Sequence, residues 1–460
     1  MQNGLLLQDR DLGTSQLESA SSSARAGLLL SQQIASDMYS LLLVLVTITI
    51  TVGITLFALN LTAGEKNLKY NIRTSYGVKD PQFLHVMGQL LGPPLVAGNR
   101  IVGLLNGDQI FPAMLTAVHK AQRTICFETY IYWSGQIGQE FADAFCARAR
   151  AGVRVHVLLD WLGSGRIDTA ILDAMKAAGV EVERYRPLRW YSLARMNHRT
   201  HRKLLVVDGE IGFTGGVGIA DEWLGNAQSP QQWRDSHFRL EGPAVAQMQA
   251  AFMDNWMKTK STVLHESEYF PQLKPAGESW AQVFKSSSRE GSESARLMYL
   301  FSIASAEQSL RLANAYFVPD NLAIDALLAA RRRGVDVQII VPGKHTDEPL
   351  VRRASRGRWG RLLEAGVQVF EFQPTMYHCK VMVVDGVWTS VGSTNFDSRS
   401  FRLNDEANLN VFDREFAARE IRNFADDQDR SKQVTLAEWQ RRPVREKAAE
   451  FLAGLFRSQL

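Results

Sequence analysis

The chain has 460 residues, which is enough for two or three ordinary domains. Hydrophobic residues make up 45% and charged residues 22% of it, a globular balance that excludes a wholly disordered protein. The net charge of +4 is too small to indicate a nucleic-acid-binding protein by bulk charge, and a mean hydropathy of −0.15 excludes many membrane spans.

One long apolar segment lies near the N-terminus. No charged residue occurs between Met38 and Gly64, and the stretch is rich in Leu, Ile, Val and Thr. It exceeds the roughly 20 residues that cross a bilayer core, which predicts a transmembrane helix over residues 38–62. A cleaved signal peptide is the weaker alternative, because 37 residues precede the segment. We expect residues 1–37, rich in Ser, Ala and Gln, to be a disordered tail.

The charges that flank this segment predict its orientation. The preceding tail has only Arg10 and Arg25 as basic residues. The residues that follow carry four, which are Lys66, Lys69, Arg73 and Lys79. By the positive-inside rule, we expect a single-pass protein of the cell (inner) membrane whose main part faces the cytoplasm. Residues 63–95 are expected to be a membrane-proximal linker. Its apolar stretch 83–96 contains two prolines, which predicts packing or interfacial contact instead of a second span.

The remainder of the chain is predicted to be one α/β unit that occurs twice. In the first half, strand, helix, strand, helix and strand are expected over residues 124–132, 139–150, 153–159, 171–178 and 180–185. In the second half, the same order is expected over residues 309–317, 322–332, 335–341, 361–364 and 367–372. The paired phrases AGVRVHVLLD and RGVDVQIIVP make the duplication explicit. This alternation predicts a largely parallel sheet with flanking helices in each half.

The duplication sets the expected domain boundaries. The first domain is predicted to span residues 96–265 and the second residues 295–460. Residues 266–294 are rich in Ser, Glu, Pro and Gly, and are predicted to be the linker between the domains.

Each half contains the same polar pattern, H-x-K-x4-D-x6-G-[GS]. Its residues are His201, Lys203, Asp208, Gly215 and Gly216 in the first copy, and His378, Lys380, Asp385, Gly392 and Ser393 in the second. On a strand, residues two apart point to one face, so each His and Lys should enter the same pocket. Two pseudo-symmetric copies would form an anion site with two titratable nitrogens, which suits phosphoryl transfer. One copy of the pattern could consist of exposed polar residues without a function, but two copies with identical spacing argue against chance.

These motifs resemble the phospholipase D superfamily and, more closely, its bacterial-type cardiolipin synthases. The phrases that carry the resemblance begin near Leu95 and include ETYIYW, NHRTHRKLLVVDG, WRDSHFRLEGP and GSTNFDSRSFRLNDEANL. The resemblance implies two pseudo-symmetric α/β sandwich domains that share one active site. It also implies that one His attacks the lipid phosphorus and that the other protonates the leaving alcohol. Gly218 is a departure from the pattern, because the second half has Asn395 at that place.

The resemblance also implies roles for the motif residues. His201 is expected to be the nucleophile and His378 the acid and base, while Lys203 and Lys380 stabilise charge on phosphate oxygens. The remaining expected site residues are Asp208 and Asp385, which complete the catalytic motif mainly through structural hydrogen bonds, and the supporting donors Asn395, Ser393, Gly215 and Gly216.

An acidic residue after each motif is expected to hold the imidazole tautomer. Asp235, 34 residues after His201, is the candidate in the first half, and Glu406, 28 residues after His378, is the candidate in the second. No metal or other cofactor is expected, because the lysines supply positive charge. The nine histidines show no metal-ligand spacing, and the three cysteines lie far apart.

The sequence therefore predicts a membrane-anchored phosphatidyltransferase that makes cardiolipin from two phosphatidylglycerols and releases glycerol. The alternatives are a phospholipase D that uses water, a nuclease of the same superfamily, and an inactive lipid-binding protein. The two intact motifs argue against an inactive protein, and the apolar segment and small net charge argue against a nucleic acid partner. No motif distinguishes a lipid alcohol from water as the acceptor, and the oligomeric state is left open.

Overall fold

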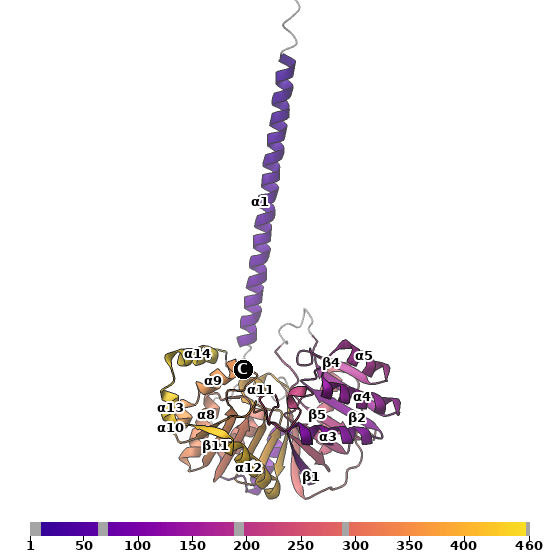
Figure 1. The fold of residues 1–460 in the computed structure, drawn as a ribbon, viewed down its shortest axis with the longest axis vertical. Helices are drawn as coiled ribbons and strands as arrows, with labels where there is room; N and C mark the ends of the chain where they lie inside the picture. The colour runs from indigo at the N-terminus through magenta and orange to yellow at the C-terminus, as the bar shows by residue number, and fades with distance from the viewer. Residues whose placement is uncertain (1–10, 63–71, 188–196, 288–293, 457–460) are drawn as a thin grey trace, which may run out of the picture. The chain divides into compact units, whose positions relative to one another are not determined.

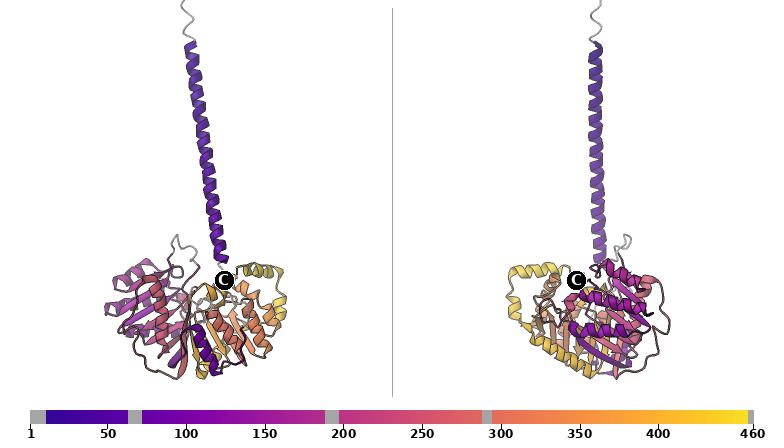
Figure 2. Two further views of the ribbon diagram at one scale, coloured as in Figure 1. Left: turned by 180° about the vertical axis from the view of Figure 1, so that it is seen from behind. Right: turned by 45° about the vertical axis from the view of Figure 1, so that its right-hand side comes forward.

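The computed structural model describes residues 11–62, 72–187, 197–287 and 294–456, which fall into two units (Figures 1 and 2). The first unit is helix α1 (Asp11–Thr62), and the apolar helix predicted over residues 38–62 lies within it. Its segment Gly27–Thr55 has a mean hydropathy of 2.1 and is long and apolar enough to cross a membrane.

The predicted disorder of residues 1–37 is wrong for residues 11–37, which continue α1. This stretch contains no proline and few glycines, so nothing in it interrupts a helix. Residues 1–10 lie outside the described part of the chain, as do residues 63–71 of the expected membrane-proximal linker and 288–293 of the expected linker between the halves.

The second unit is built on one mixed sheet. In sheet order its strands are β17 (Ser431–Val434), β12 (Gln368–Phe372), β11 (Asp336–Pro342), β9 (Ser309–Asn314), β13 (Lys380–Val384), β14 (Trp388–Gly392), β16 (Glu406–Phe412), β8 (Ser279–Ser286), β1 (Val96–Leu105), β7 (Ser236–Glu241), β6 (Ile211–Gly215), β5 (Leu204–Val207), β2 (Thr124–Thr129), β3 (Arg154–Asp160) and β4 (Glu181–Tyr185). Strands β10 (Phe317–Val318) and β15 (Phe396–Asp397) form a separate parallel pair.

Helices cover this sheet (Figure 1). They are α2 (Pro81–Leu91), α3 (Asn106–Lys120), α4 (Gln136–Arg150), α5 (Thr169–Ala177), the 3-10 helix η2 (Asp221–Trp223), α6 (Val245–Lys260), α7 (Ser294–Ala304), α8 (Asn321–Arg332), α9 (Pro349–Arg356), α10 (Gly360–Glu364), α11 (Ser398–Arg402), α12 (Arg414–Asp429), α13 (Leu436–Gln440) and α14 (Val444–Gly454).

The two halves repeat the same strand order around the antiparallel pair β1–β8. Outward from this pair, β7, β6, β5, β2, β3 and β4 correspond to β16, β14, β13, β9, β11 and β12. The α/β duplication expected from the sequence is therefore present. The pair β1–β8 joins both halves into one continuous sheet through Val96 opposite Ala281 and Asn99 opposite Ser279.

The expectation of a largely parallel sheet holds only for the outer strands. Strands β2, β3 and β4 are parallel, as are β9, β11 and β12, but the motif strands β5 and β13 run antiparallel to their neighbours. A tight hairpin turn after each motif strand makes β5 antiparallel to β6 and β13 antiparallel to β14. Asp208 and Gly209 have φ of 54° and 66°, and Asp385 and Gly386 have φ of 50° and 64°. An Asp-Gly pair with both φ values positive is the usual turn between antiparallel strands.

Two segments that were expected to be linkers contain regular structure. Strand β8 lies within residues 266–294 and pairs with both β16 and β1, so much of that segment belongs to the sheet. Helix α2 lies within residues 63–95 and buries Phe83 and Met87 completely in the core of the second half. The apolar stretch 83–96 therefore packs against protein, as its length and prolines predicted.

The core extends across the boundary between the halves. One buried cluster lies mainly in each half, and a third contains side chains of both, including Val206 of β5 and Val383 of β13. Helices α6 and α12 contribute Phe252 and Phe416 to this third cluster. Close packing of this kind resists relative motion of the halves, so a site between them has fixed geometry.

Candidate active site

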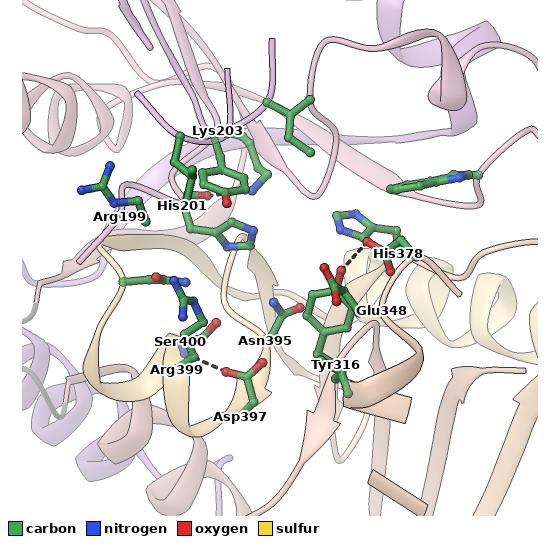
Figure 3. Close-up of a pocket in the computed structure, with 18 of the residues that line it drawn as sticks. Arg199, His201, Lys203, Tyr316, Glu348, His378, Asn395, Asp397, Arg399 and Ser400 are labelled. Atoms are coloured by element: carbon green, nitrogen blue, oxygen red, sulfur yellow. Dashed lines mark hydrogen bonds between the residues drawn. The ribbon is translucent and has the colours of Figure 1, made fainter. Parts of the chain in front are cut away.

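A cavity of about 650 Å³ is lined by residues of both halves. His201 and His378 face each other across it, one from each copy of the motif (Figure 3). Both side chains are largely buried, with exposed fractions of 8% and 4%. The structure thus brings the two histidines to one centre, as the duplicated motif predicted.

Each histidine is held by a carboxylate from the opposite half. Nδ1 of His201 lies 3.1 Å from both carboxylate oxygens of Glu406, and Nδ1 of His378 lies 2.7 Å from Oδ2 of Asp235. The sequence identified both acids, but the pairing within each half is wrong. The partners are exchanged between the halves.

Backbone hydrogen bonds explain this exchange. The amide N–H of His201 donates to the carbonyl oxygen of Asp405 at 2.8 Å, and that of His378 donates to the carbonyl oxygen of Arg234 at 2.8 Å. Each motif therefore pairs with the residue just before the acid of the other half. Sequence separation gives no sign of this pairing, because it forms only when the two halves pack together.

The two carboxylates are themselves fixed by hydrogen bonds. Glu406 accepts a hydrogen bond from the hydroxyl of Ser393 at 2.5 Å. Asp235 accepts hydrogen bonds from Nε1 of Trp223 at 2.9 Å and from the amide of Ser236 at 2.8 Å. Because both acids are fully buried, these contacts decide their orientation.

Both motif lysines are buried beside the histidines. Nζ of Lys203 donates to the carbonyl oxygen of His201 at 2.9 Å, and Nζ of Lys380 donates to that of His378 at 2.6 Å. Nζ of Lys380 also lies 3.1 and 3.2 Å from the two ring nitrogens of His378. The histidines precede their strands instead of lying in them, since β5 begins at Leu204 and β13 at Lys380.

Burial sets the charge state of the site. It lowers the pKa of His201 to about 4, despite Glu406, and it also lowers the pKa of His378. It lowers the pKa of Lys203 to about 7. Burial opposes ionisation of Glu406 and Asp235, but the adjacent histidine and lysine charges outweigh it and hold both carboxyl pKa values below the usual range. At neutral pH the site thus contains neutral imidazoles and ionised carboxylates.

Asp208 and Asp385 stand apart from the cavity. The Asp208 carboxylate accepts hydrogen bonds from the backbone amides of residues 122–124 at 2.7 to 2.9 Å. The Asp385 carboxylate accepts the equivalent bonds from residues 307–309 at 2.8 to 2.9 Å. Both make structural hydrogen bonds at the motif hairpins, and neither lines the cavity, so neither is placed to contact a substrate there.

Three of the four supporting donors expected from the sequence make contacts within the protein instead of facing the cavity. The amide of Gly216 already donates to the carbonyl of Ser236, and a Cβ at Gly216 would collide with the Asp235 carboxylate. Gly215 is similarly packed against β7. The Ser393 hydroxyl is committed to Glu406. Asn395 alone lines the cavity, with its Oδ1 atom unpartnered.

Further charged residues of the cavity were missed by the sequence analysis. Arg166, Arg199 and Arg399 contribute cations, and Arg166 stacks on Trp133 at 4.3 Å. The acidic pair Asp347 and Glu348 lies near Tyr316, and the acids Glu222 and Asp397 also line the cavity. Figure 3 shows Arg199 and Arg399 on the side of His201, and Glu348 and Tyr316 on the side of His378.

These residues come from segments that converge only in the fold. Arg199 lies beside the first motif and Arg399 lies in the phrase NFDSRS, so proximity to a motif was the available signal for both. The acidic pair has no comparable signal. Within the described ranges, no group of three or more His, Cys, Asp or Glu side chains is arranged to hold a metal ion.

Comparisons with known proteins agree with this architecture. The family model described as "Cardiolipin synthase, PLD-like domain" matches residues 114–256 and 299–428. A cardiolipin synthase of Geobacillus kaustophilus is 34% identical over 79% of this chain and 72% of its own. Cardiolipin synthase 1 of Bacillus anthracis is 32% identical over 84% of this chain and 77% of its own.

A solved structure supports the fold. The phosphatidylserine synthase of Haemophilus influenzae has a TM-score of 0.64 at 14% identity, covering 82% of this chain and all of that one. At this identity the likeness concerns the fold alone. The duplicated motif, the shared cavity, the family match and the extent of the sequence relationships together show that the chain belongs to the cardiolipin synthase family of phospholipase D-like proteins.

Proposed function

We propose that this protein is a cardiolipin synthase that transfers a phosphatidyl group from one phosphatidylglycerol to another and releases glycerol. The observation that carries the proposal is the pair of histidines that face each other across one cavity in a chain of this family. The apolar helix within α1 and the family relationship both indicate association with a membrane, where lipid substrates reside.

The first step forms a phosphohistidine. Because Glu406 occupies Nδ1 of His201, the nitrogen available to attack the phosphorus is Nε2. The P–O bond to the glycerol headgroup breaks as the N–P bond forms, and His378, in its protonated form, donates a proton to the departing oxygen. The 2.7 Å contact with Asp235 favours the protonated imidazole at His378, as does the negative charge of a bound phosphodiester.

The second step reverses these roles with a different alcohol. His378, now neutral, removes a proton from a hydroxyl of the second phosphatidylglycerol, whose oxygen attacks the phosphorus. The N–P bond breaks and His201 is regenerated. Lys203 and Asn395 line the cavity and stabilise the phosphate oxygens during both steps, and the ammonium of Lys380 adds positive charge beside the ring of His378. Asp208 and Asp385 support the hairpins that follow the two lysines.

The cations of the cavity favour an anionic lipid as the second substrate. Arg166, Arg199 and Arg399 lie in the same cavity as the histidines, and a phosphatidylglycerol acceptor brings a phosphate of its own. Water carries no charge and gains nothing from these arginines. This difference supports lipid transfer over hydrolysis.

The test is a lipid analysis of full-length protein in phosphatidylglycerol vesicles. We expect cardiolipin and glycerol from the wild type and neither from His201→Ala, and added glycerol should drive the reaction backwards. Phosphatidic acid without cardiolipin at any phosphatidylglycerol density would refute the synthase and support a phospholipase D.

We also propose that α1 spans the cell membrane once and that the catalytic unit is cytoplasmic. The proposal rests on the basic residues after the apolar segment, including Arg73 and Lys79, compared with Arg10 and Arg25 before it. Protease added outside intact spheroplasts should leave the catalytic unit uncut. Cleavage of that unit from outside would contradict this topology.

A further inference from the structure

Helix α14 packs on the protein with its polar side inward. Glu450 is 6% exposed and forms ion pairs with Arg442 and Arg356, and Ala453 is 1% exposed beneath it. The opposite side is apolar and solvent-facing. Its residues and exposed fractions are Val444 82%, Phe451 71%, Leu452 58% and Leu455 63%. An amphipathic helix that docks on its own domain normally buries the apolar side, so this arrangement indicates another apolar surface as partner.

The inner side of α14 touches the wall of the active-site cavity. Ala453 packs in a small buried cluster with Val351 of α9 and Val318, and Tyr316 packs against the same cluster. Val351 and Tyr316 both line the cavity. Figure 1 shows α14 beside α9 at the rim of the catalytic unit. Only one layer of side chains therefore separates the exposed helix from the site.

Other exposed apolar side chains lie beside the same cavity. Leu162, from the first half, lines it and is 55% exposed, and its neighbour Trp161 is 36% exposed. Leu350, from the second half, is 40% exposed and lies between the cavity residues Glu348 and Val351. Exposed apolar side chains therefore occur at the cavity or next to it in sequence in both halves.

The charges around α14 indicate an anionic partner. Arg441 precedes the helix and is exposed, as are Arg445 and Lys447 within it. Across the fully described helix, Glu446 is the single exposed acid. An apolar face bordered by cations is the composition of helices that lie in the headgroup layer of anionic membranes.

We propose that α14 is an interfacial helix that lies on an anionic bilayer and places the cavity opening at the level of the lipid headgroups. This inference rests on the proposed function in one respect, namely that the substrates are lipids of that bilayer. A two-chain lipid that leaves the membrane exposes its acyl chains to water. With the opening at the surface, only the headgroup has to enter the cavity.

The test measures the membrane contact of α14 directly. Full-length protein carrying Leu455→Cys is labelled with an environment-sensitive fluorophore and reconstituted in vesicles of phosphatidylglycerol and phosphatidylcholine. The native cysteines Cys126, Cys146 and Cys379 are buried, which directs the label to position 455. Ala425→Cys is the matched control, because Ala425 is exposed on α12. Figures 1 and 2 show α12 at the end of the catalytic unit opposite to α14.

We expect lipids with a quenching group near the headgroup to quench the label at position 455 and to leave the label at 425 unquenched. Equal quenching of the label at positions 455 and 425 would overturn the proposal. A different outcome is that the label at position 455 reports an apolar environment in detergent without any vesicle, and does so increasingly as protein concentration rises. The partner of α14 is then a second copy of the chain, and the proposal is also overturned.

A negative charge introduced on the apolar side of α14 adds a functional readout. Phe451→Glu should lower cardiolipin formation from bilayer-embedded phosphatidylglycerol about fivefold or more, and leave turnover of a short-chain micellar analogue at the wild-type level. An equal loss on both substrates would contradict the proposal. Quenching at 455 in a protein that makes no cardiolipin would refute the proposed function alone, whereas cardiolipin formation without quenching would refute the docking alone.

Discussion

The two halves of the site have the same arrangement of strands, but they differ in how each holds its imidazole. At His378, the short side chain of Asp235 makes one contact of 2.7 Å, and Gly216 leaves the room that this carboxylate needs. At His201, the longer Glu406 makes two contacts of 3.1 Å, and the Ser393 hydroxyl holds it. The Gly or Ser of the motif therefore follows the length of the acid that it faces.

The halves differ also in what they present to a phosphate. Asn395 lines the cavity from the second half. The equivalent Gly218 has no side chain, and a Cβ there would press on Ile131. Duplication thus preserved the histidines and lysines, while packing around them made two unequal half-sites. Unequal half-sites suit a reaction in which one imidazole forms a bond to phosphorus and the other moves protons.

Loss of either imidazole is expected to have the largest effect. His201→Ala and His378→Ala should each reduce turnover by about a thousandfold or more, since one variant lacks the nucleophile and the other the acid and base. Rapid quenching should detect a phosphohistidine in wild-type protein but none in His201→Ala. A phosphohistidine located at position 378 by peptide mapping would exchange the two roles.

Changes to Asp235 and Glu406, the carboxylates that hold the histidine of the opposite half, should have the next largest effect. Asp235→Asn should slow turnover about 100-fold, because it removes the negative charge that lies 2.7 Å from His378. Glu406→Gln should cost about tenfold, because the longer contacts to His201 are weaker and Ser393 still orients the amide. NMR of labelled histidine should show Asp235→Asn perturbing His378, and Glu406→Gln perturbing His201. Perturbation of the histidine in the same half would disprove the exchange.

The pH dependence should separate the two lysines. Burial lowers the pKa of Lys203 to about 7, so the ammonium form is lost as pH rises through this value. The kcat/KM should therefore fall above about pH 7, by up to about tenfold per pH unit. Lys203→Arg should lower the rate overall and remove this alkaline decline, since guanidinium stays charged. A decline that persists unchanged in Lys203→Arg would assign it to another group, such as Lys380.

The smallest effect on chemistry is expected from the hairpin aspartates. Asp208→Ala and Asp385→Ala each remove three hydrogen bonds to backbone amides, which should lower the free energy of unfolding by about 3 kcal/mol. Thermal unfolding should show similar losses for both variants, with turnover per folded molecule changed little. A loss of turnover as severe as that of His201→Ala, in a stable protein, would place the aspartate in the reaction.

The sequence by itself determined the duplication, the apolar helix, and the histidines, lysines and two acids at the centre of the site. The repeated spacing of His, Lys and Asp carries this information, because residues two apart in an extended chain share a face. Strand β8 was missed since its short apolar run lies among Ser, Glu, Gly and Pro. The antiparallel motif strands were missed although the Asp-Gly pairs after them are a hairpin signal.

Only the tertiary structure decided which acid serves which histidine. Asp235 and Glu406 each lie within 35 residues of one histidine along the chain, yet each binds the other one, because the two halves pack against each other across a shared core. The outward apolar side of α14 was decided in the same way. Periodicity shows that a helix has an apolar face, but the ion pairs of Glu450 with Arg442 and Arg356 decide which face turns inward.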